Sequence, residues 1–324
     1  MTLLSRRSLL ASLAGASVTF PATRAAFAAT DFPTRAVRIA VGFAPGGTTD
    51  ILARIIADKL REYWGVSVIV ENRPGADGII ATNSVFQSTP DGYMLLMSTN
   101  AITITPHMKT LPYDPVKDFE PITIVGQEYH HLMVTPSLPV KTVREFIDLA
   151  KSTPKGLTFA SAGPGSAPFL AMQRFMDAAT IPHMVHVPFS GSAPALQALV
   201  TGNVQAMFSS PSTTLQMALA GKVRIIGVAG PARDPNVPDI PTIAESALPG
   251  FQSNTWFALM ALSKVPPEIL EKVRADAIHA MHEPDVRKRI LTAGSSPVGN
   301  SAEEFRKVIA EDMEIYRQVV AKIK

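Results

Sequence analysis

The sequence predicts an α/β protein of two lobes, each a mostly parallel sheet flanked by helices. Short apolar runs lead into Gly-rich turns and then into stretches with helical apolar spacing, which is the order of β-α-β units. This succession restarts after residue 131, and no low-complexity segment or long linker separates the two halves. We therefore expect two compact lobes joined by extended crossings of the chain.

The first half alternates strands and helices. A helix over residues 49–64 has apolar residues at helical spacing and is ended by Gly65. A second helix follows the Gly-rich turn at 71–78 and runs to about Gln87. Strands are expected at 37–43, 67–70 and 93–97. This β-α-β-α-β order predicts a parallel sheet with helices on both faces.

The second half repeats the plan without repeating the sequence. Thr142 and Glu145 have the spacing of a capping box before a helix at 143–151. Ser192 is expected as the N-cap of a later helix that Gly202 ends. The other expected elements are strands at 132–135, 157–160, 184–187, 206–208, 224–228 and 256–262, and helices at 168–178, 267–282, 284–292 and 302–323. Residues 231–249 are Pro-rich and expected to be irregular.

The first 28 residues have the anatomy of a secretory signal peptide. Arg6 and Arg7 precede an apolar run at residues 9–20, and small residues place a cleavage site near Ala28. The run is too short to span a bilayer. The segment Ser-Arg-Arg-Ser-Leu-Leu resembles a twin-arginine export signal, with ordinary Sec export as the alternative. The mature protein is therefore expected to be exported.

Composition excludes several classes of function. The 324 residues include no cysteine, so disulfides and thiolate metal sites are ruled out. The formal charge of +3 belongs to three arginines of the leader; without them, 27 Lys and Arg face 27 Asp and Glu. The mature chain has no net-charge reason to bind nucleic acid or an anionic membrane. No cofactor and no metal site is predicted.

The turn in VGFAPGGTTD, residues 41–50, is the first candidate binding element. No lysine follows Gly47, so it is not a P-loop, and the glycine spacing is not a dinucleotide fingerprint. The amides at the start of the following helix are unpaired and electropositive, which favours an anion. A turn with no ligand is an equally weighted interpretation. Asp50 either favours the helix end, receives a donor from the ligand or fixes Thr48.

A second Gly-rich turn, at residues 161–166, lies in the other half and could face the same cleft. Catalytic patterns are poor by comparison. There is no G-x-S-x-G elbow, and no His–acid pair is identifiable beside Ser161 or Ser166. His279 and His282 lie one helical turn apart, where a solvated helix face is favoured over a metal pair. Core packing is the favoured role of Trp256 and Phe257.

Several motifs together carry a resemblance to a known family. In order they are the leader, FAPGGTTD, VIVENRPGADG, TPDGYMLL, FASAGPGS, VHVPFSGSAPALQALVTGNVQAMF and PGFQSNTWFAL. They resemble the extracytoplasmic solute receptors of tripartite tricarboxylate transporters, the Bug family, over essentially the whole mature chain. The resemblance implies a type II periplasmic-binding-protein (Venus flytrap) fold. One lobe would comprise residues 31–131 plus 254–324, and the other residues 132–253.

The same resemblance implies the ligand, its site and the partners. A small carboxylate would be held by the two glycine turns, partly through ordered water, in a periplasmic receptor that is a monomer and serves membrane subunits of the transporter. Position by position, the expected ligand-binding residues are Phe43, Pro45, Gly46, Gly47, Thr48 and Asp50 from the first turn, Ser161, Ala162, Gly163, Gly165 and Ser166 from the second, and Asn100, Ser190 and Ser210.

The sequence departs from the family pattern in the second half. Ala167, Pro168 and Phe169 stand where a hydroxyl residue and a histidine are common. Ser190 replaces a common lysine, and Ser209-Ser210 replace Asp-Asn. The wall that contacts the rest of the ligand is therefore less polar. We expect a ligand with an apolar or aromatic body and one or two carboxylates, rather than a citrate-like ligand or an amino acid.

Two classes of function remain open from the sequence. The leading prediction is a non-catalytic receptor that closes on its ligand and presents it to a transporter. The alternative is an exported α/β enzyme that uses the glycine turns as an oxyanion site. A sensor domain of a regulator is a third idea, disfavoured because no DNA-binding segment is present and the leader exports the chain.

Overall fold

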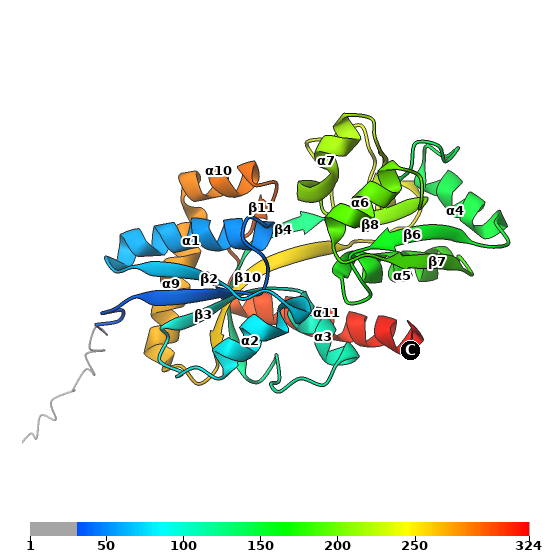
Figure 1. The fold of residues 1–324 in the computed structure, drawn as a ribbon. Coiled ribbons are helices and arrows are strands. Elements are labelled where there is room, and N and C mark those ends of the chain that lie inside the picture. Colours follow the sequence, from blue (N-terminus) through cyan, green and yellow to red (C-terminus); the bar gives the residue numbers. More distant parts are fainter. Residues whose placement is uncertain (1–30, 324) are drawn as a thin grey trace, which may run out of the picture. The chain divides into compact units, whose positions relative to one another are not determined.

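The computed structural model describes residues 31–323, so the predicted signal peptide at residues 1–28 lies outside the described residues. Two sheets form the framework (Figure 1). One has six strands in the order β11-β4-β10-β3-β1-β2, and the other has five in the order β7-β6-β8-β5-β9. The strands are β1 (Val37–Val41), β2 (Val68–Asn72), β3 (Met94–Thr99), β4 (Phe119–Tyr129), β5 (His131–Val134), β6 (Leu157–Ser161), β7 (Met184–Pro188), β8 (Ala206–Ser209), β9 (Arg224–Val228), β10 (Asn254–Leu262) and β11 (Ser296–Pro297).

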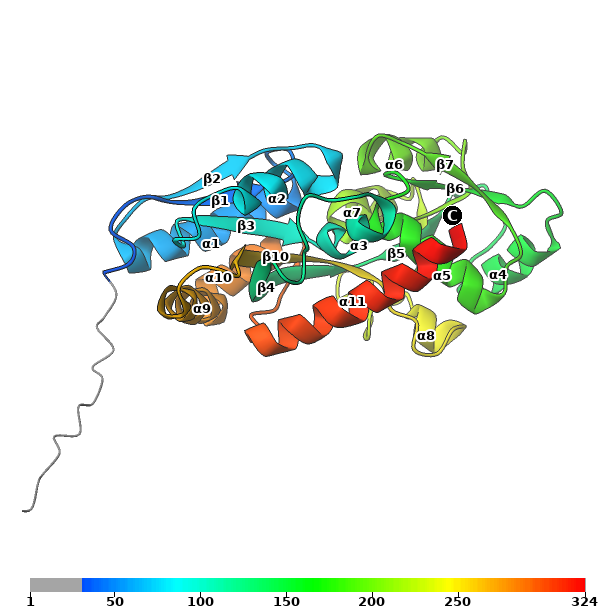
Figure 2. The same ribbon diagram turned by 90° about the horizontal axis from the view of Figure 1, so that it is seen from below.

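Helices pack on both sheets, as Figure 2 shows from a second direction. They are α1 (Thr48–Trp64), the 3-10 turn η1 (Ala76–Gly78), α2 (Ile79–Phe86), α3 (Ala101–Met108), α4 (Val143–Ser152), α5 (Ala167–Ala179), α6 (Ser192–Val200), α7 (Pro211–Leu219), α8 (Ile243–Ser246), α9 (Pro267–His282), α10 (Pro284–Thr292) and α11 (Ala302–Ile323). The predicted capping box of α4 is present, because Glu145 N–H donates to Thr142 Oγ1 at 3.2 Å and Thr142 N–H donates to Glu145 Oε2.

Most strands of each sheet run in one direction, as predicted. In the described five-stranded sheet, β6, β7 and β8 are mutually parallel, and β9 shares their direction because β5 is antiparallel to both β8 and β9. In the six-stranded sheet β1, β2, β3 and β4 share a direction, whereas β10 and β11 oppose it. The sheets are therefore mixed rather than purely parallel.

Several elements were not expected from the sequence. The pattern of β4 is interrupted by Pro121 and Gly126, and α3 contains Pro106 among β-branched residues that disfavour helices. Near its start, helix α7 contains Ser and Thr residues, which disfavour helix interiors. Helix α8 and strand β11, with 4 and 2 residues, are too short to show a hydrophobic period. One cap was wrong: Gly191 caps α6, and Ser192 is its first helical residue.

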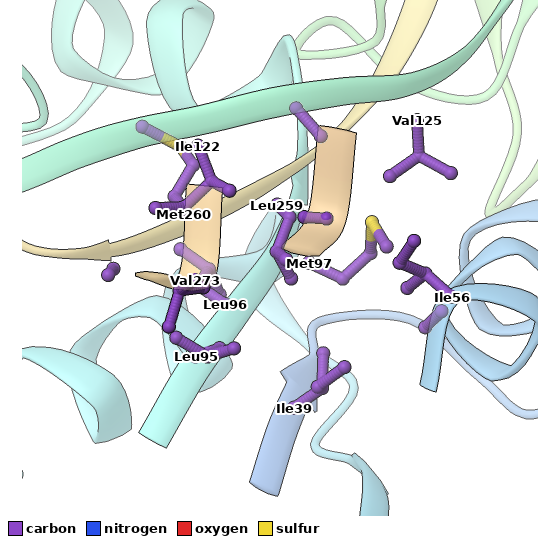
Figure 3. Close-up of a cluster of buried hydrophobic side chains, with 14 of the residues drawn as sticks. Ile39, Ile56, Leu95, Leu96, Met97, Ile122, Val125, Leu259, Met260 and Val273 are labelled. Atoms are coloured by element: carbon purple, nitrogen blue, oxygen red, sulfur yellow. The ribbon is translucent and has the colours of Figure 1, made fainter. Parts of the chain in front are cut away.

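Each sheet has its own hydrophobic core, and helices α3 and α11 contribute to both. Figure 3 shows part of the core of the six-stranded sheet, where side chains such as Ile39, Ile56 and Leu259 meet between strands and helices. A second core forms under the five-stranded sheet. Helix α11 places Phe305 in the first core and Tyr316 in the second. The two sheets are thus joined by packing as well as by the chain.

The chain crosses between the sheets at two adjacent points. His130 is the single residue between β4 and β5, and its N–H donates to the Ser253 carbonyl at 2.9 Å, just before β10. The buried His130 ring bonds Ser253 Oγ and Thr255 Oγ1, both at 3.0 Å. Burial, together with the neighbouring His131, lowers the pKa of His130 to about 3, so the ring is neutral. His131 points elsewhere and lies 2.9 Å from Asp234.

The capping box of α4 offers a direct test of this local structure. Thr142→Ala removes the side-chain acceptor for the Glu145 amide and should lower the free energy of unfolding by about 1 kcal/mol. Urea denaturation would show this as a lower midpoint with an unchanged slope. The exposed Thr110→Ala is the matched control and should leave the midpoint unchanged. Equal midpoints for the wild type and Thr142→Ala would contradict the cap.

Candidate functional site

A cavity of about 470 Å³ is lined by residues from both sheets and their helices. The six-stranded side contributes residues of the first glycine turn, the start of α3 and the ends of β4 and β10. The five-stranded side contributes the second glycine turn and the starts of α6 and α7. Nine predicted residues line this cavity: Phe43, Gly47, Thr48, Asn100, Ala162, Gly165, Ser166, Ser190 and Ser210. The predicted residues Pro45, Gly46, Asp50, Ser161 and Gly163 do not line it.

Asp50 lies behind the first turn and holds it in place. Its buried carboxylate accepts the Gly46 N–H at 2.9 Å, the Asn72 side-chain amide at 2.9 Å and the Arg54 guanidinium at 2.9 and 3.0 Å. Burial by itself raises the pKa of Asp50, but the bonds from Arg54, Gly46 and Asn72 outweigh it and hold the pKa below its usual value. Asp50 therefore stabilises the turn, and it does so through Gly46, Arg54 and Asn72 rather than through Thr48.

The start of α1 leaves its first amides unpaired toward the cavity. Gly47 is the N-cap, and within the described chain no side chain caps this helix. The first intrahelical bond runs from the Ile51 N–H to the Gly47 carbonyl at 3.0 Å, so the amides of Thr48 and Thr49 precede it. Both threonines line the cavity. The cavity is therefore bordered by the uncapped, electropositive start of a 17-residue helix.

The second turn is held by its own serines. Gly163 has φ of +119°, a backbone conformation that favours glycine, and its N–H donates to Ser161 Oγ at 3.1 Å. Ser166 Oγ donates to the Gly163 carbonyl at 2.7 Å and accepts the Phe169 N–H at the start of α5. The α5 helix start is therefore already capped, in contrast to α1. The Ser166 side chain lines the cavity while fixing the turn.

A Ser–His contact lies behind this turn that the sequence did not reveal. Ser161 Oγ lies 2.8 Å from His186 Nε2, because β6 and β7 are parallel neighbours that bring residues 25 positions apart together. The His186 ring packs on Phe159 and Phe169, with centroids 4.9 and 4.5 Å away, and burial lowers its pKa. Ser161 is buried and does not line the cavity. The pair therefore faces the protein rather than the site.

Asn100 lines the cavity, and its side-chain amide nitrogen is hydrogen-bonded to other parts of the protein. Its Nδ2 donates to the Asn254 carbonyl at 2.9 Å and to the Tyr316 hydroxyl at 3.1 Å. The side-chain oxygen is thus the group left to face a ligand. Ser190 precedes the Gly191 cap of α6, and Ser210 is the N-cap of α7, so both serines stand at helix starts around the cavity.

The sequence missed several cavity residues, of which Glu128 is the most distinctive. It lies on β4 directly opposite Thr255 on β10, and both side chains line the cavity. Glu128 Oε2 accepts the Ser212 hydroxyl at 2.7 Å, and Oε1 accepts the Ser295 hydroxyl at 2.8 Å. Burial raises the pKa of Glu128, and the serine hydroxyls partly offset this. No motif pointed to it, because the β4 pattern itself was not recognised.

Two contacts close the rims of the cavity. Thr48 Oγ1 donates to Ser212 Oγ at 3.3 Å, which joins the start of α1 to α7. On the other side, a Cβ on Gly165 would lie 3.3 Å from Asp77 Oδ2, so the second turn approaches η1 closely. Asp77 in turn pairs with Lys109 at 3.0 Å. A ligand in the cavity would therefore touch both sheets at once.

Other candidate chemistry finds no support in the described part of the chain. Residues 31–323 contain no group of three or more His, Cys, Asp or Glu side chains placed to hold a metal ion. His279 lies 3.5 Å from Glu283, and His282 Nδ1 lies 2.7 Å from the Ile278 carbonyl. Of the described helices, none combines the length and apolarity needed to cross a membrane.

Two sheets flanked by helices, joined by short crossings and sharing one cavity, are the architecture of a solute-binding protein. A family model described as the tripartite tricarboxylate transporter family receptor matches residues 52–324, and the chain belongs to this family. Family members are periplasmic receptors. BugT of Bordetella pertussis is 30% identical over 300 residues, covering 90% of this chain and 92% of BugT. The resemblance seen in the sequence motifs is thereby confirmed.

Solved structures of similar proteins confirm the fold. The R. palustris protein Rpa4515, described with adipate, has a TM-score of 0.79 and 31% identity, covering 90% of this chain and 97% of that protein. MatC from Rhodopseudomonas palustris, described with bound malate, has a TM-score of 0.75 and 32% identity, covering 89% of this chain and 100% of MatC.

The network around Asp50 predicts a pH-dependent loss of stability. Asp50→Asn removes a buried charged acceptor and should cost about 1–3 kcal/mol of unfolding free energy at pH 7. Because the pKa of Asp50 is lowered in the folded state, its stabilisation is present above the unfolded-state pKa and is lost on acidification. The difference from wild type should therefore narrow below about pH 4. Glu62→Gln, at an exposed position of the same helix, is the control, and a pH-independent difference for Asp50→Asn would contradict this role.

Proposed function

We propose that this protein captures a small carboxylate in the cavity between its two sheets and delivers it to the membrane subunits of a tripartite tricarboxylate-type transporter. The observation that carries the proposal is the uncapped start of α1, whose Thr48 and Thr49 line a cavity that both sheets share. The family assignment supplies the transporter class. Export through a signal peptide cleaved near Ala28, residence in the periplasm and a monomeric state belong to the same proposal.

A carboxylate fits this end of the cavity on physical grounds. Free helix amides and serine hydroxyls donate hydrogen bonds to an anion, and the helix dipole adds about 0.3–1 kcal/mol, or about 2 kcal/mol in a partly buried site. Thr48 and Ser166 supply hydroxyls from the two turns. The similar proteins described with adipate and malate bind ligands of this chemistry. We propose that Gly47, Thr48, Gly165 and Ser166 contact the carboxylate, with Phe43, Asn100, Ala162, Ser190 and Ser210 around it.

The rest of the cavity suits an apolar ligand body. Phe43 and Phe257 line the six-stranded side, and Ala167 and Pro168 line the other. Phe257 serves both roles, since it is 5% exposed and packs in the core while one face borders the cavity. An aromatic or otherwise partly apolar acid is therefore favoured over a citrate-like ligand or an amino acid. Tight binding of citrate or aspartate with none of aromatic acids would contradict this preference.

A non-catalytic role is favoured, and the Ser161–His186 contact is the observation that supports the enzyme alternative. In a Ser hydrolase the hydroxyl must reach the substrate while a base accepts its proton. Here Ser161 is buried, its hydroxyl is also engaged with Gly163, and it does not line the cavity. A receptor returns its ligand unchanged, so recovery of intact ligand after prolonged incubation supports the receptor, whereas turnover that Ser161→Ala abolishes supports the enzyme.

The central test is native mass spectrometry of freshly purified mature protein, followed by a thermal-shift panel of adipate, malate and benzoate. A retained or stabilising carboxylate is the expected result. A ligand at 100 times its dissociation constant should add about 2.7 kcal/mol to stability. A protein that retains no ligand and is stabilised by no carboxylate would refute the proposal.

Gly47→Trp should abolish ligand stabilisation while preserving the fold. Gly47 has φ of −77° and an added Cβ would approach nothing closer than Ala44 O at 3.5 Å, so the backbone accepts a side chain. The indole would fill the space in front of the α1 amides. The melting temperature of the ligand-free variant should match wild type, and the ligand-induced stabilisation of about 2.7 kcal/mol should vanish. Ala220→Trp, exposed at the end of α7, is the control and should keep the shift.

A further inference from the structure

We infer that Glu128 sets the charge selectivity of the cavity, so that the receptor prefers a monocarboxylate carrying a hydrogen-bond donor over a dicarboxylate of the same length. This inference rests on the proposed function and narrows its ligand class. It concerns a residue that the sequence motifs do not mark. It predicts weak binding of dicarboxylates here, whereas similar proteins are described with the dicarboxylates adipate and malate.

The position of Glu128 gives it access to a ligand. Glu128 is the second-to-last residue of β4 and pairs with Thr255 of β10. It borders the cavity although the whole residue is only 2% exposed. Ser212 and Ser295 fix its two oxygens from different elements, at 2.7 and 2.8 Å. Each oxygen accepts one of these serine hydroxyls, and the hydroxyls of Ser210 and Thr48, which line the cavity, also interact with the carboxyl. A hydroxyl or ammonium group on a ligand would therefore donate to Glu128 in place of the Ser210 hydroxyl, without displacing Ser212 or Ser295.

The cavity contains no cation to balance this carboxyl. Among its described lining residues there is no Lys, Arg or His, and the ionisable ones are Asp77 and Glu128. Asp77 is neutralised by Lys109 at 3.0 Å and is partly exposed. Glu128 has neutral hydroxyls as its hydrogen-bond partners. An ionised carboxyl in such surroundings is costly, and a second anion beside it is more so.

The charged groups behind and beside Glu128 are occupied by their own partners. On α1, Arg54 pairs with Asp50 at 2.9 Å. Glu128 also borders a second cavity of about 450 Å³, whose other charged residues are Arg233 and Asp234. Arg233 pairs with Glu245 at 3.1 Å, and Asp234 with His131 at 2.9 Å. These pairs leave the carboxyl of Glu128 without a counter-ion from any neighbouring element described here.

The chemistry of selection follows from these facts. A first carboxylate on the ligand is stabilised by the α1 amides and the turn hydroxyls. A second carboxylate reaches the uncapped starts of α6 and α7. Ser212 at the start of α7 is already bonded to Glu128, so that carboxylate meets the like charge of Glu128 or forces Glu128 to take up a proton. A hydroxyl in the same place donates to Glu128 and satisfies a buried acceptor instead. Selectivity thus includes a repulsive element against dianions as well as an attractive one.

Matched ligands of equal length test this directly. Isothermal titration at pH 8 would compare hexanoate, 6-hydroxyhexanoate and adipate, and separately 4-methylbenzoate, 4-(hydroxymethyl)benzoate and terephthalate. In the wild type, the hydroxy acid of at least one series should bind about tenfold or more tighter than the diacid. Tighter binding of the diacid in both series would overturn the inference without any variant.

Variants then assign the effect to Glu128. Glu128→Gln keeps the size and one acceptor oxygen, turns the other oxygen into a donor and removes the charge, so the preference for the hydroxy acid should fall to about twofold or less through improved diacid binding. Glu128→Met keeps the volume and removes the acceptors as well, so the methyl-terminated acid should gain most. Glu303→Gln on the exposed face of α11 is the matched control and should leave the wild-type ratio unchanged.

The outcomes separate this inference from the proposed function. Removal of a buried carboxyl whose pKa is raised should not lower stability at pH 8, because that carboxyl is destabilising when ionised. A single cooperative melting transition well above the titration temperature shows that Glu128→Gln is folded, so its measured ratio counts for or against the inference. If both series bind and the ratios are unchanged by Glu128→Gln, this inference fails while the receptor stands. If no acid binds the wild type and none is retained on purification, the proposed function itself fails.

Discussion

The antiparallel ladder between β4 and β10 is the interaction on which the rest of the molecule depends. The two strands are paired along their whole length, from Phe119–Leu262 to Tyr129–Asn254. Strand β4 ends, and β10 begins, where the chain crosses between the two sheets. Side chains alternate along the ladder, so Thr255 and Phe257 face the cavity while Trp256 faces α11 and bonds Asp312 at 2.8 Å. The ladder thereby fixes the core, the crossing and one wall of the site together.

Two buried carboxylates near the cavity show how partners decide the state of an acid. Asp50 is surrounded by a guanidinium, a backbone amide and a side-chain amide, and its pKa is lowered in spite of burial. Glu128 receives serine hydroxyls, which donate more weakly than a cation, and its pKa is raised. One acid therefore stabilises the turn as a permanent anion. The other remains a polar group whose charge is sensitive to what lies next to it.

The sequence predicted the parts of the fold that depend on local pattern. Helix α1 with Gly65 at its end, the capping box of α4 and the direction of most strands follow from spacing and from cap chemistry that neighbouring residues decide. Strand β4 and helices α3 and α7 escaped prediction because Pro121, Pro106 and a Ser/Thr-rich segment contradict the local propensities, and tertiary packing overrides them. The same holds for the site. The glycine turns could be found from their motifs, whereas Ser161–His186 and Glu128–Ser212 join residues 25 and 84 positions apart, for which a single sequence gives no signal.

Helix α11 gives the molecule a mechanical linkage between the cavity and the C-terminal end of the described chain. Its first part is anchored in the core of the six-stranded sheet through Phe305, and its later part in the other core through Tyr316. The Tyr316 hydroxyl accepts from Asn100, which borders the cavity, and Lys322 pairs with Asp177 on α5 at 2.6 Å. Because α11 packs into both cores, it resists separation of the two sheets. Any change in the spacing of the two sheets would therefore bend α11 or break its packing in one core, although this helix lines no part of the cavity.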